Sequence, residues 1–426
     1  MTHVPGLDRP TLRTPLVDRL RLELAPLLGE IAAGARRREL DGELPREAVR
    51  RLQDAGFTAL RVPSSHGGGG ARLPEVTQLW IDLAAADAHL PQALRGHFAL
   101  VEDRWWHHRQ GEDQTAWFAR FARGEIAGNA WSEVGGTGIS TQQTVLRPDG
   151  RDGSGWRLDG SKYYTTGTIF ADWIDVYVRR LHPDGSEDFA IAVVDAHAPG
   201  VTVLDDWDGF GQRGTGSGTT TFDDVRVEAT HVLTFTDRFP YQTALYQLNL
   251  LATLVGIGRA ALRDAVEEVR RRERNYSHAN AARVRDDPQV LAVVGQVAAD
   301  VYTAEAVTIR VATALQEVAD LAGGPDATLR ARAANELAEV EASAAQVSVT
   351  ELVLQATTRL FDALGASATS RDLALDRHWR NARTVSSHNP RVLKARVVGA
   401  HLVNGTPPPY AWAIGTTERD EAPAPR

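Results

Sequence analysis

The feature that most restricts the fold is a change of pattern in the middle of the chain. Residues 129–232 hold short runs of alternating hydrophobic and polar residues between Gly, Asp and Pro, a pattern typical of short strands. The segments before and after follow helical periodicity over longer stretches. One block of strands between two blocks of helices predicts an α+β protein or separate domains.

We expect helices in the first part, short strands in the middle and long helices in the last part. The first helices are predicted over 16–35, 45–55, 74–86, 92–109 and 114–122. The strands are predicted over 143–147, 155–158, 173–180, 189–194 and 219–227, as a compact antiparallel sandwich or barrel. The last helices, 243–274, 288–321, 326–364 and 391–402, suit a four-helix bundle. The predicted domains are 1–128, 129–232 and 233–426.

Composition removes several classes of function. The net charge of −8 argues against nucleic acid or anionic membranes as partners. The chain has no cysteine, which excludes disulfides, thiolate metal ligands and a cysteine nucleophile. No His–carboxylate spacing predicts a metal site, and no uninterrupted apolar stretch reaches membrane-spanning length. Without a signal-peptide pattern at the start, we expect a cytoplasmic protein.

Four motifs follow one another at spacings that resemble the acyl-CoA dehydrogenase superfamily. They are Asn-Ala-Trp-Ser-Glu at 129–133 followed by Val-Gly-Gly-Thr-Gly at 134–138, the segment 158–167 with its Gly-x-Lys-x-x-x-Thr pattern, the glycine-rich 211–218 that leads into 222–227, and 251–274, which ends in arginines. The resemblance implies the acyl-CoA dehydrogenase fold: an N-terminal helical domain, a small antiparallel β-domain and a C-terminal four-helix bundle.

The C-terminal segment narrows the resemblance. A typical acyl-CoA dehydrogenase carries a glutamate base here, but nothing between Arg377 and Pro390 is a carboxylate. Residues 375–390 instead resemble the two-component flavin monooxygenases of the superfamily, such as dibenzothiophene monooxygenase and sulfone-utilisation enzymes. That implies reduced FMN, with FAD less expected, supplied by a separate NAD(P)H:flavin reductase. Through a flavin hydroperoxide, O2 would oxygenate a small, fairly apolar organic substrate, for instance at sulfur.

The resemblance also assigns catalytic residues. His388 stands where these monooxygenases have a histidine, a residue that titrates near neutrality and serves as general acid or base. Relatives often have a second histidine three residues earlier, where this chain has Val385. Thr166 and Asn129 would position the flavin and the bound oxygen. The alternative for His388 is a helix-end histidine bonded to a carbonyl group, and for Thr166 an ordinary strand residue.

Cofactor contacts are assigned in the same way. Next to the flavin ring the resemblance places five residues, Asn129, Trp131, Ser132, Tyr164 and Thr166. For the phosphate it offers the cluster 271–274, with Arg272 and Arg274, and also Arg371. A guanidinium binds phosphate in a bidentate manner, although arginines at the end of a helix can also simply complement its dipole. His97 is either a substrate contact or a packed helical histidine.

Three rival readings stay open. The chain could be an acyl-CoA dehydrogenase or oxidase, but the opening of the first bundle helix, 241–249, also lacks a carboxylate. A flavoenzyme of the nitroalkane-oxidising or N-hydroxylating kind shares the fold. A non-catalytic binding or structural subunit belongs to another class. In each enzymatic case the resemblance implies a homotetramer.

Overall fold

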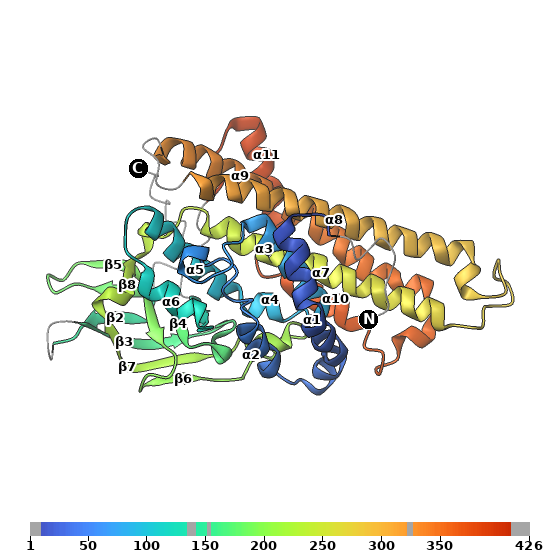
Figure 1. Cartoon of the computed structure of the whole chain (residues 1–426), viewed down its shortest axis with the longest axis horizontal. Coiled ribbons are helices and arrows are strands. Elements are labelled where there is room, and N and C mark those ends of the chain that lie inside the picture. Colours follow the sequence, from blue (N-terminus) through green and yellow to red (C-terminus); the bar gives the residue numbers. More distant parts are fainter. Residues whose placement is uncertain (1–9, 134–141, 151–154, 322–326, 410–426) are drawn as a thin grey trace.

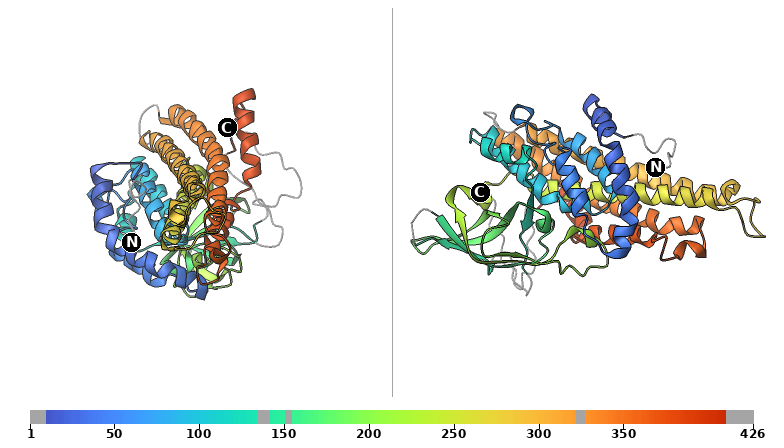
Figure 2. Two further views of the ribbon diagram at one scale, coloured as in Figure 1. Left: turned by 90° about the vertical axis from the view of Figure 1, so that its right-hand side faces the viewer. Right: turned by 60° about the horizontal axis from the view of Figure 1, so that its bottom comes forward.

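The computed structural model describes residues 10–133, 142–150, 155–321 and 327–409. Figure 1 shows an elongated molecule, with the strands at one end and long helices that run to the other end. The N-terminal helices lie beside both (Figure 2). The predicted α+β fold, with helices, a central β part and a helical bundle in that order, is confirmed.

Six helices precede the strands and confirm the predicted helical segments. They are α1 Pro15–Asp41, α2 Arg46–Asp54, α3 Leu73–Ala86, α4 Leu90–Ala93, α5 Arg95–Arg109 and α6 Thr115–Ala122. The first begins where the Thr14 hydroxyl accepts a hydrogen bond from the backbone of Val17 at 3.2 Å. It ends at Gly42, whose φ of +67° lies in the left-handed region that favours glycine. Thus α1 has start and stop signals in its own sequence.

The strands form one eight-stranded sheet. They are β1 Ala127–Ala130, β2 Val145–Pro148, β3 Gly155–Lys162, β4 Trp173–Leu181, β5 Glu187–Asp195, β6 Val201–Val203, β7 Thr220–Glu228 and β8 Val232–Thr234. Their order is β6-β7-β3-β2-β4-β5-β8, and β1 pairs with β4. Most neighbours are antiparallel, as predicted, but β1 and β2 both run parallel to β4. We propose domain divisions near 126 and 234, because those at 128 and 232 would cut β1 and separate β8 from the sheet.

The last part of the chain is the predicted bundle. Its helices are α7 Gln242–Arg271, α8 Pro288–Asp320, α9 Ala327–Arg359 and α10 Asp376–Ser386, and α11 Lys394–Asn404 packs on α9. The helix α10 was not predicted as an element. Its polar face carries several arginines, and its buried face consists of only five residues, namely His378, Asn381, Ala382, Val385 and Ser386. So short an apolar stripe gives little periodic signal.

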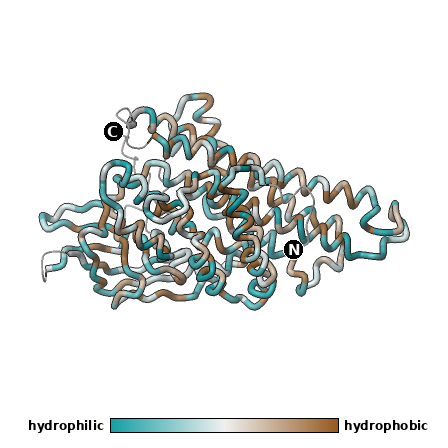
Figure 3. Tube along the Cα trace, viewed as in Figure 1, coloured by the Kyte–Doolittle hydropathy of each residue, from teal (hydrophilic) through white to brown (hydrophobic). Residues whose placement is uncertain are grey.

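One hydrophobic core joins the N-terminal helices to the bundle. It combines side chains of α1, α2 and α3 with those of α7, α8 and α9, and hydrophobic and hydrophilic segments alternate along these helices in Figure 3. Gly256 of α7 permits the close approach of α3, because a Cβ at that position would lie 2.2 Å from the Cβ of Ala84. A second core fills the sheet, and a third, rich in aromatic residues, joins α5 and α6 to β4 and β5. The helical parts and the sheet are therefore packed as one body.

Two bundle helices, α7 and α8, are long and apolar enough to cross a membrane by length and composition. In α7, 89% of the apolar window is buried inside the fold, as expected for the central helix of a bundle. In α8 only 28% of that window is buried. Leu291 and Tyr302 are 51% and 71% exposed there, so α8 presents an uncovered apolar face.

Candidate active site

The first strand and the loop that follows β3 bring two of the predicted catalytic residues together. The backbone N–H of Asn129 donates to the carbonyl oxygen of Thr166 at 3.4 Å, and both side chains are buried. The Thr166 hydroxyl lies 2.8 Å from the hydroxyl of Ser217, a residue of the glycine-rich motif that the sequence did not single out. At Gly167, with φ +78°, a Cβ would lie 1.9 Å from the carbonyl oxygen of Ala93. The motif thus ends in a turn pressed against α4.

The lysine of the same motif is structural. Lys162 Nζ donates to a Glu133 carboxylate oxygen at 2.8 Å and to the carbonyl of Trp131 at 3.3 Å. Glu133 also accepts from the backbone of Thr144 at 2.9 Å. This buried ion pair ties β3 to the segment after β1, so it fixes the predicted flavin wall. The other half of the first motif, 134–138, lies outside the described residues.

Trp131 forms a wall of the candidate site. Its indole N–H donates to Asp175 at 2.8 Å, and the same carboxylate accepts from Arg238 at 2.6 Å. The guanidinium of Arg238 lies 5.3 Å from the Trp131 ring centroid. Ser132 accepts a backbone hydrogen bond from Tyr163 at 2.9 Å and has a half-buried side chain. The ring of Trp131 is therefore held rigidly, while Ser132 is free to meet a ligand.

The remaining aromatic candidate lies at the rim. Tyr164 has φ +65° and is 51% exposed, and its ring meets Trp207 edge-on at 5.8 Å. A tyrosine rarely adopts such a backbone conformation, so neighbouring structure must impose it. Its place beside Thr166 agrees with the predicted contact to a flavin.

His388 follows the end of α10. Its side chain is reached by solvent, yet surrounding protein and, next, the charge of Arg95 lower its pKa to about 3. The ring is therefore neutral at pH 7. Val385, at the position of the second histidine in relatives, is 2% exposed and packs in the hydrophobic core. A second imidazole at that position would thus be buried in this chain.

Two residues near this site, Arg95 and Tyr246, lie outside the motifs and were not predicted. Arg95, the first residue of α5, is 5% exposed, and its guanidinium lies 5.0 Å from the ring centroid of Tyr246 on α7. Both the Nε atom of Arg95 and the hydroxyl of Tyr246 are buried, and neither has a hydrogen-bond partner among the residues that the structure describes. A Cβ on the adjacent Gly96 would lie 3.1 Å from the side-chain oxygen of Asn129. Arg95 is thus adjacent to the residue that packs on Asn129, and its charge reaches His388.

His97, predicted as a possible substrate contact, lies in the core. It has no solvent exposure, and its Nε2 lies 2.8 Å from the carbonyl oxygen of Thr58 while its Nδ1 accepts from the backbone of Ala127 at 3.3 Å. Burial lowers its pKa to about 4. With both ring nitrogens engaged in the core, His97 cannot serve as the predicted substrate contact. Its role is to fasten α5 to β1.

The arginines predicted for the phosphate lie at the far end of the bundle. Arg272 donates to Ser367 at 2.7 Å, and both border a hollow of about 960 Å³ that Arg274 also lines. Arg371 is exposed on a nearby segment. At 1.5 Å per residue, the 25 residues from Tyr246 to Arg271 along α7 span roughly 37 Å. One flavin cannot meet Asn129 and Arg272 of the same chain.

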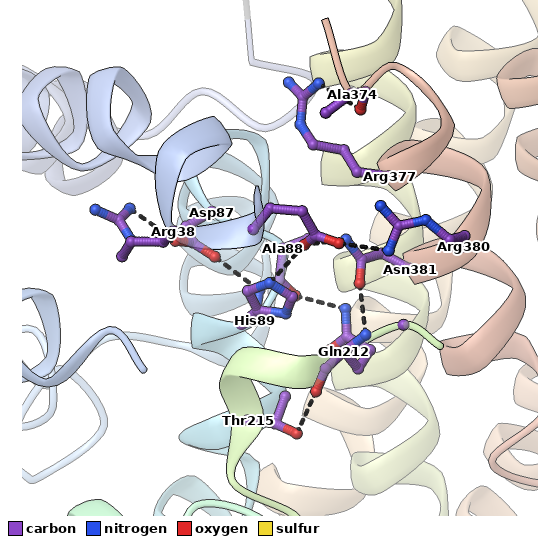
Figure 4. A network of polar contacts seen from close by, with 12 residues as sticks. Arg38, Asp87, Ala88, His89, Gln212, Thr215, Ala374, Arg377, Arg380 and Asn381 are labelled. Carbon is purple, nitrogen blue, oxygen red and sulfur yellow. Dashed lines mark hydrogen bonds and ion pairs between the residues drawn. The ribbon is translucent and has the colours of Figure 1, made fainter. Parts of the chain in front are cut away.

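A polar network holds α10 in place (Figure 4). Glu39 of α1 receives hydrogen bonds from Arg380 and Asn381 of α10 at 2.7 and 3.2 Å, and its other partner is His89 at 3.0 Å. Asn381 in turn accepts from the backbone of Gln212 at 2.5 Å. The glycine-rich motif is thus joined to α10, the helix that leads to His388.

The residues around Asn129 fit a flavin ring. The side-chain oxygen of Asn129 is buried and has no partner in the described part of the chain, so it can accept from a ring N–H. The Thr166 hydroxyl supplies a polar contact, and Trp131 and Tyr164 supply flat apolar surface beside it.

Comparison with known proteins agrees with this geometry. Three family models match in chain order: the N-terminal domain of acyl-CoA dehydrogenase over 27–125, its middle domain over 129–225 and its C-terminal domain over 248–390. The probable FMNH2-dependent monooxygenase SfnC of Pseudomonas putida is 27% identical over 90% of this chain and 94% of its own length. A dibenzothiophene monooxygenase of Rhodococcus erythropolis is 28% identical over 84% of this chain and 86% of its own.

A solved structure extends the likeness to three dimensions. FMN-bound TdsC of Paenibacillus sp. A11-2 is 29% identical and superposes with a TM-score of 0.82, covering 92% of this chain and 98% of its own. The order of helices, sheet and bundle, the three matched domain models and these relatives all agree. The chain belongs to the acyl-CoA dehydrogenase superfamily and groups there with the flavin-dependent monooxygenases.

Proposed function

We propose that this chain is a flavin-dependent monooxygenase that uses reduced FMN and O2 to oxygenate a small organic substrate, with sulfur as the favoured atom. Two observations support the proposal: the buried residues Asn129 and Thr166 lie together, and Arg95, next to the residue that packs on Asn129, acts by its charge on the ring of His388. In the described part of the chain, no carboxylate figures among the groups that shift the pKa of His388 or Arg95. The site therefore offers an imidazole where a dehydrogenase needs a carboxylate base.

Each residue has a defined task. When bound, reduced FMN supplies two electrons to O2, so that one oxygen atom enters the substrate and the other leaves as water. Asn129 orients the polar edge of the ring through its unpaired oxygen, and Thr166 donates or accepts a hydrogen bond beside it. His388, neutral at pH 7, donates a hydrogen bond from one ring nitrogen and accepts one at the other. The aromatic wall around Trp131 excludes water, which would discharge activated oxygen unproductively.

The dehydrogenase alternative lacks a base in the right place. Glu339 of α9 is the buried carboxyl whose pKa burial raises to about 8. It accepts from the backbone of Ala244 at 2.8 Å, at the start of α7. Glu339 is therefore engaged as a cap of the first turn of α7.

The proposal includes an assembly and a reductase. A homotetramer would cover the apolar face of α8 and bring the Arg272 hollow of one copy to the FMN phosphate of another, since a single chain keeps them about 37 Å apart. A separate NAD(P)H:flavin reductase would supply reduced FMN, and a cytoplasmic location would give that reductase its NAD(P)H.

Two measurements test the function. Anaerobic titration with reduced FMN should show binding, and O2 uptake with a flavin reductase should yield oxygenated product from sulfides, sulfones, indoles or amines. Reduction of bound flavin by an acyl-CoA without a reductase would instead establish the dehydrogenase alternative. If the protein fails to bind flavin in either redox state, it is a non-catalytic subunit and the proposal is wrong.

A further inference from the structure

Arg95 is a buried cation near the proposed flavin site, with 5% of its surface exposed, and it packs on the ring of Tyr246. Among the residues that the structure describes, no carboxylate pairs with its guanidinium, and its buried Nε atom has no hydrogen-bond partner. Buried charges in proteins are normally paired, because an unpaired one loses its hydration without compensation. A buried guanidinium without a carboxylate partner can bind an anion that comes from outside the chain.

The neighbouring charges do not neutralise it. Arg238 lies between two carboxylates, with its Nη1 2.6 Å from Asp175 and its Nε 3.7 Å from Asp103. Arg104 lies 2.9 Å from Asp103 as well. Both carboxylates are therefore engaged by guanidinium groups other than that of Arg95.

The position of Arg95 relates it to the reacting centre. The next residue, Gly96, packs against Asn129 on the flavin side. On the other side Arg95 is close enough to His388 for its charge to act on the imidazole. A ligand bound by Arg95 would thus have its remaining atoms beside both the flavin wall and His388. Arg95 itself comes from α5 and Tyr246 from α7, so both belong to the helices that border the site.

We propose that Arg95 is a specificity-determining residue that binds an anionic group of the substrate, a carboxylate, sulfinate or sulfonate. The planar fork of a guanidinium matches two oxygens of such a group. The ring of Tyr246 packs against the guanidinium, and the Tyr246 hydroxyl, which has no partner among the described residues, can donate a hydrogen bond to the same anionic group. This inference rests on the proposed monooxygenase function and narrows its substrates to small monoanions.

The test compares matched ligand pairs, each an aryl or alkyl sulfide carrying either a carboxylate or the corresponding amide, such as 4-(methylthio)benzoate and 4-(methylthio)benzamide. Binding is followed through the absorbance of bound oxidised FMN and, in FMN-free protein, through the rise in Tm. The unaltered chain should bind the acid of at least one pair about ten-fold or more tightly than the amide. Arg95→Gln should weaken the acid about 10- to 100-fold, which corresponds to losing one charged hydrogen bond, and leave the amide and FMN within two-fold.

Two further variants serve as controls for Arg95→Gln. Arg95→Lys keeps the charge and should retain a preference for the acid even if Arg95→Gln folds poorly. Arg50→Gln removes a surface arginine of α2 and should change nothing. Acids that bind no better than amides throughout the panel, or not at all, overturn the inference. So does an Arg95→Gln variant whose affinity for reduced FMN falls as much as that for acids, because Arg95 would then serve the flavin.

The two proposals fail separately. If the protein binds FMN and transfers oxygen but shows no preference for acids, the proposed anion site is wrong and the proposed monooxygenase function stands. Acid-dependent stabilisation of a chain that binds no flavin would support the anion site and remove the monooxygenase.

Discussion

The imidazole of His388 is neutral at pH 7, although a free histidine is partly charged there. Protein around the ring and the charge of Arg95 both disfavour the imidazolium. A neutral ring carries a hydrogen-bond donor and an acceptor at once, which suits a residue that positions the reacting oxygen.

A pH profile tests that state. Because the folded pKa of His388 is lowered to about 3, the ring stays neutral at every pH above that value. We expect kcat/KM to show no inflection near pH 6.5 and any acidic loss to begin far below it. A bell with an acidic limb at 6 to 7 would mean that the imidazolium forms within the working range.

Removal of the ring gives a second expectation. His388→Ala should lower coupled oxygenation by about 100- to 1,000-fold, the usual contribution of a positioned hydrogen-bond donor at a reacting oxygen. The matched control is Ser387→Ala, whose exposed hydroxyl bonds only the carbonyl of Arg383. Product yield per NAD(P)H consumed is the readout, and full coupling in His388→Ala would remove the role proposed for the ring.

The sequence predicted site residues that belong to motifs, but not the residues that the fold brings next to them. Asn129, Thr166 and His388 each lie in a segment that resembles the superfamily. Arg95, Tyr246 and Ser217 are brought to the site by three different elements, so no local pattern joins them. One signal was present: Arg95 is the single charged residue in the otherwise buried stretch 90–101.

Among elements, the turn at Gly167 is the most constrained contact between the sheet and α4. Gly167→Ala combines a left-handed φ with a Cβ 1.9 Å from a carbonyl oxygen, so we expect a loss of more than about 3 kcal/mol in unfolding free energy. Gly185→Ala is the control, since Gly185 has φ +83° and open space around it, and should cost about 1 kcal/mol. Equal losses in chemical denaturation would contradict the packing argument.

The contacts that fasten α1 to α4 and α10 depend on pH. Burial would lower the pKa of His89, but its hydrogen bond to Glu39 and the nearby carboxylates raise it. Burial would likewise raise the pKa of Glu39, but hydrogen bonds and charges lower it to about 2. The contribution of His89 is complete below about 6.5 and is lost as pH rises through its raised pKa. That of Glu39 is complete above about 4.5 and lost as pH falls toward 2.

Glu39→Gln should therefore lower Tm most between about pH 4.5 and 6.5. The difference from the unaltered chain should shrink on either side of that window. Melting curves across pH 3 to 9 measure it, with Glu47→Gln on the surface of α2 as control. A pH-independent difference would show that the charges of this pair contribute nothing.

Element prediction succeeded where periodicity was long. The helices α7, α8 and α9 each exceed 29 residues, and their apolar repeats are unmistakable in the sequence. The strands β1, β6 and β8, of three or four residues, and the parallel pairing of β1 and β2 with β4 depend on tertiary partners. The short helix α10 is held by Glu39 and Gln212 rather than by its own pattern.

At the scale of the whole molecule, the distance along α7 separates two kinds of flavin contact. If the phosphate is bound by a second copy, a mixture of two defective variants should recover activity. One variant, Asn129→Ala, should lose contact with the flavin ring. The other, Arg272→Ala with Arg274→Ala, should lose the binding of the FMN phosphate in the distant hollow. Co-refolded, they should regain roughly a quarter of normal activity, since mixed contacts restore some intact sites. No recovery in oligomers shown to be mixed would mean that each chain binds FMN alone.

The carboxylate of Glu39 joins the opening helix of the chain to the short helix that precedes His388. The two are more than 300 residues apart in sequence, so protein made on a ribosome cannot close this contact until nearly the whole chain has emerged. Loss of the Glu39 contact would consequently weaken turnover at the imidazole, although Glu39 lies far from His388 along the chain.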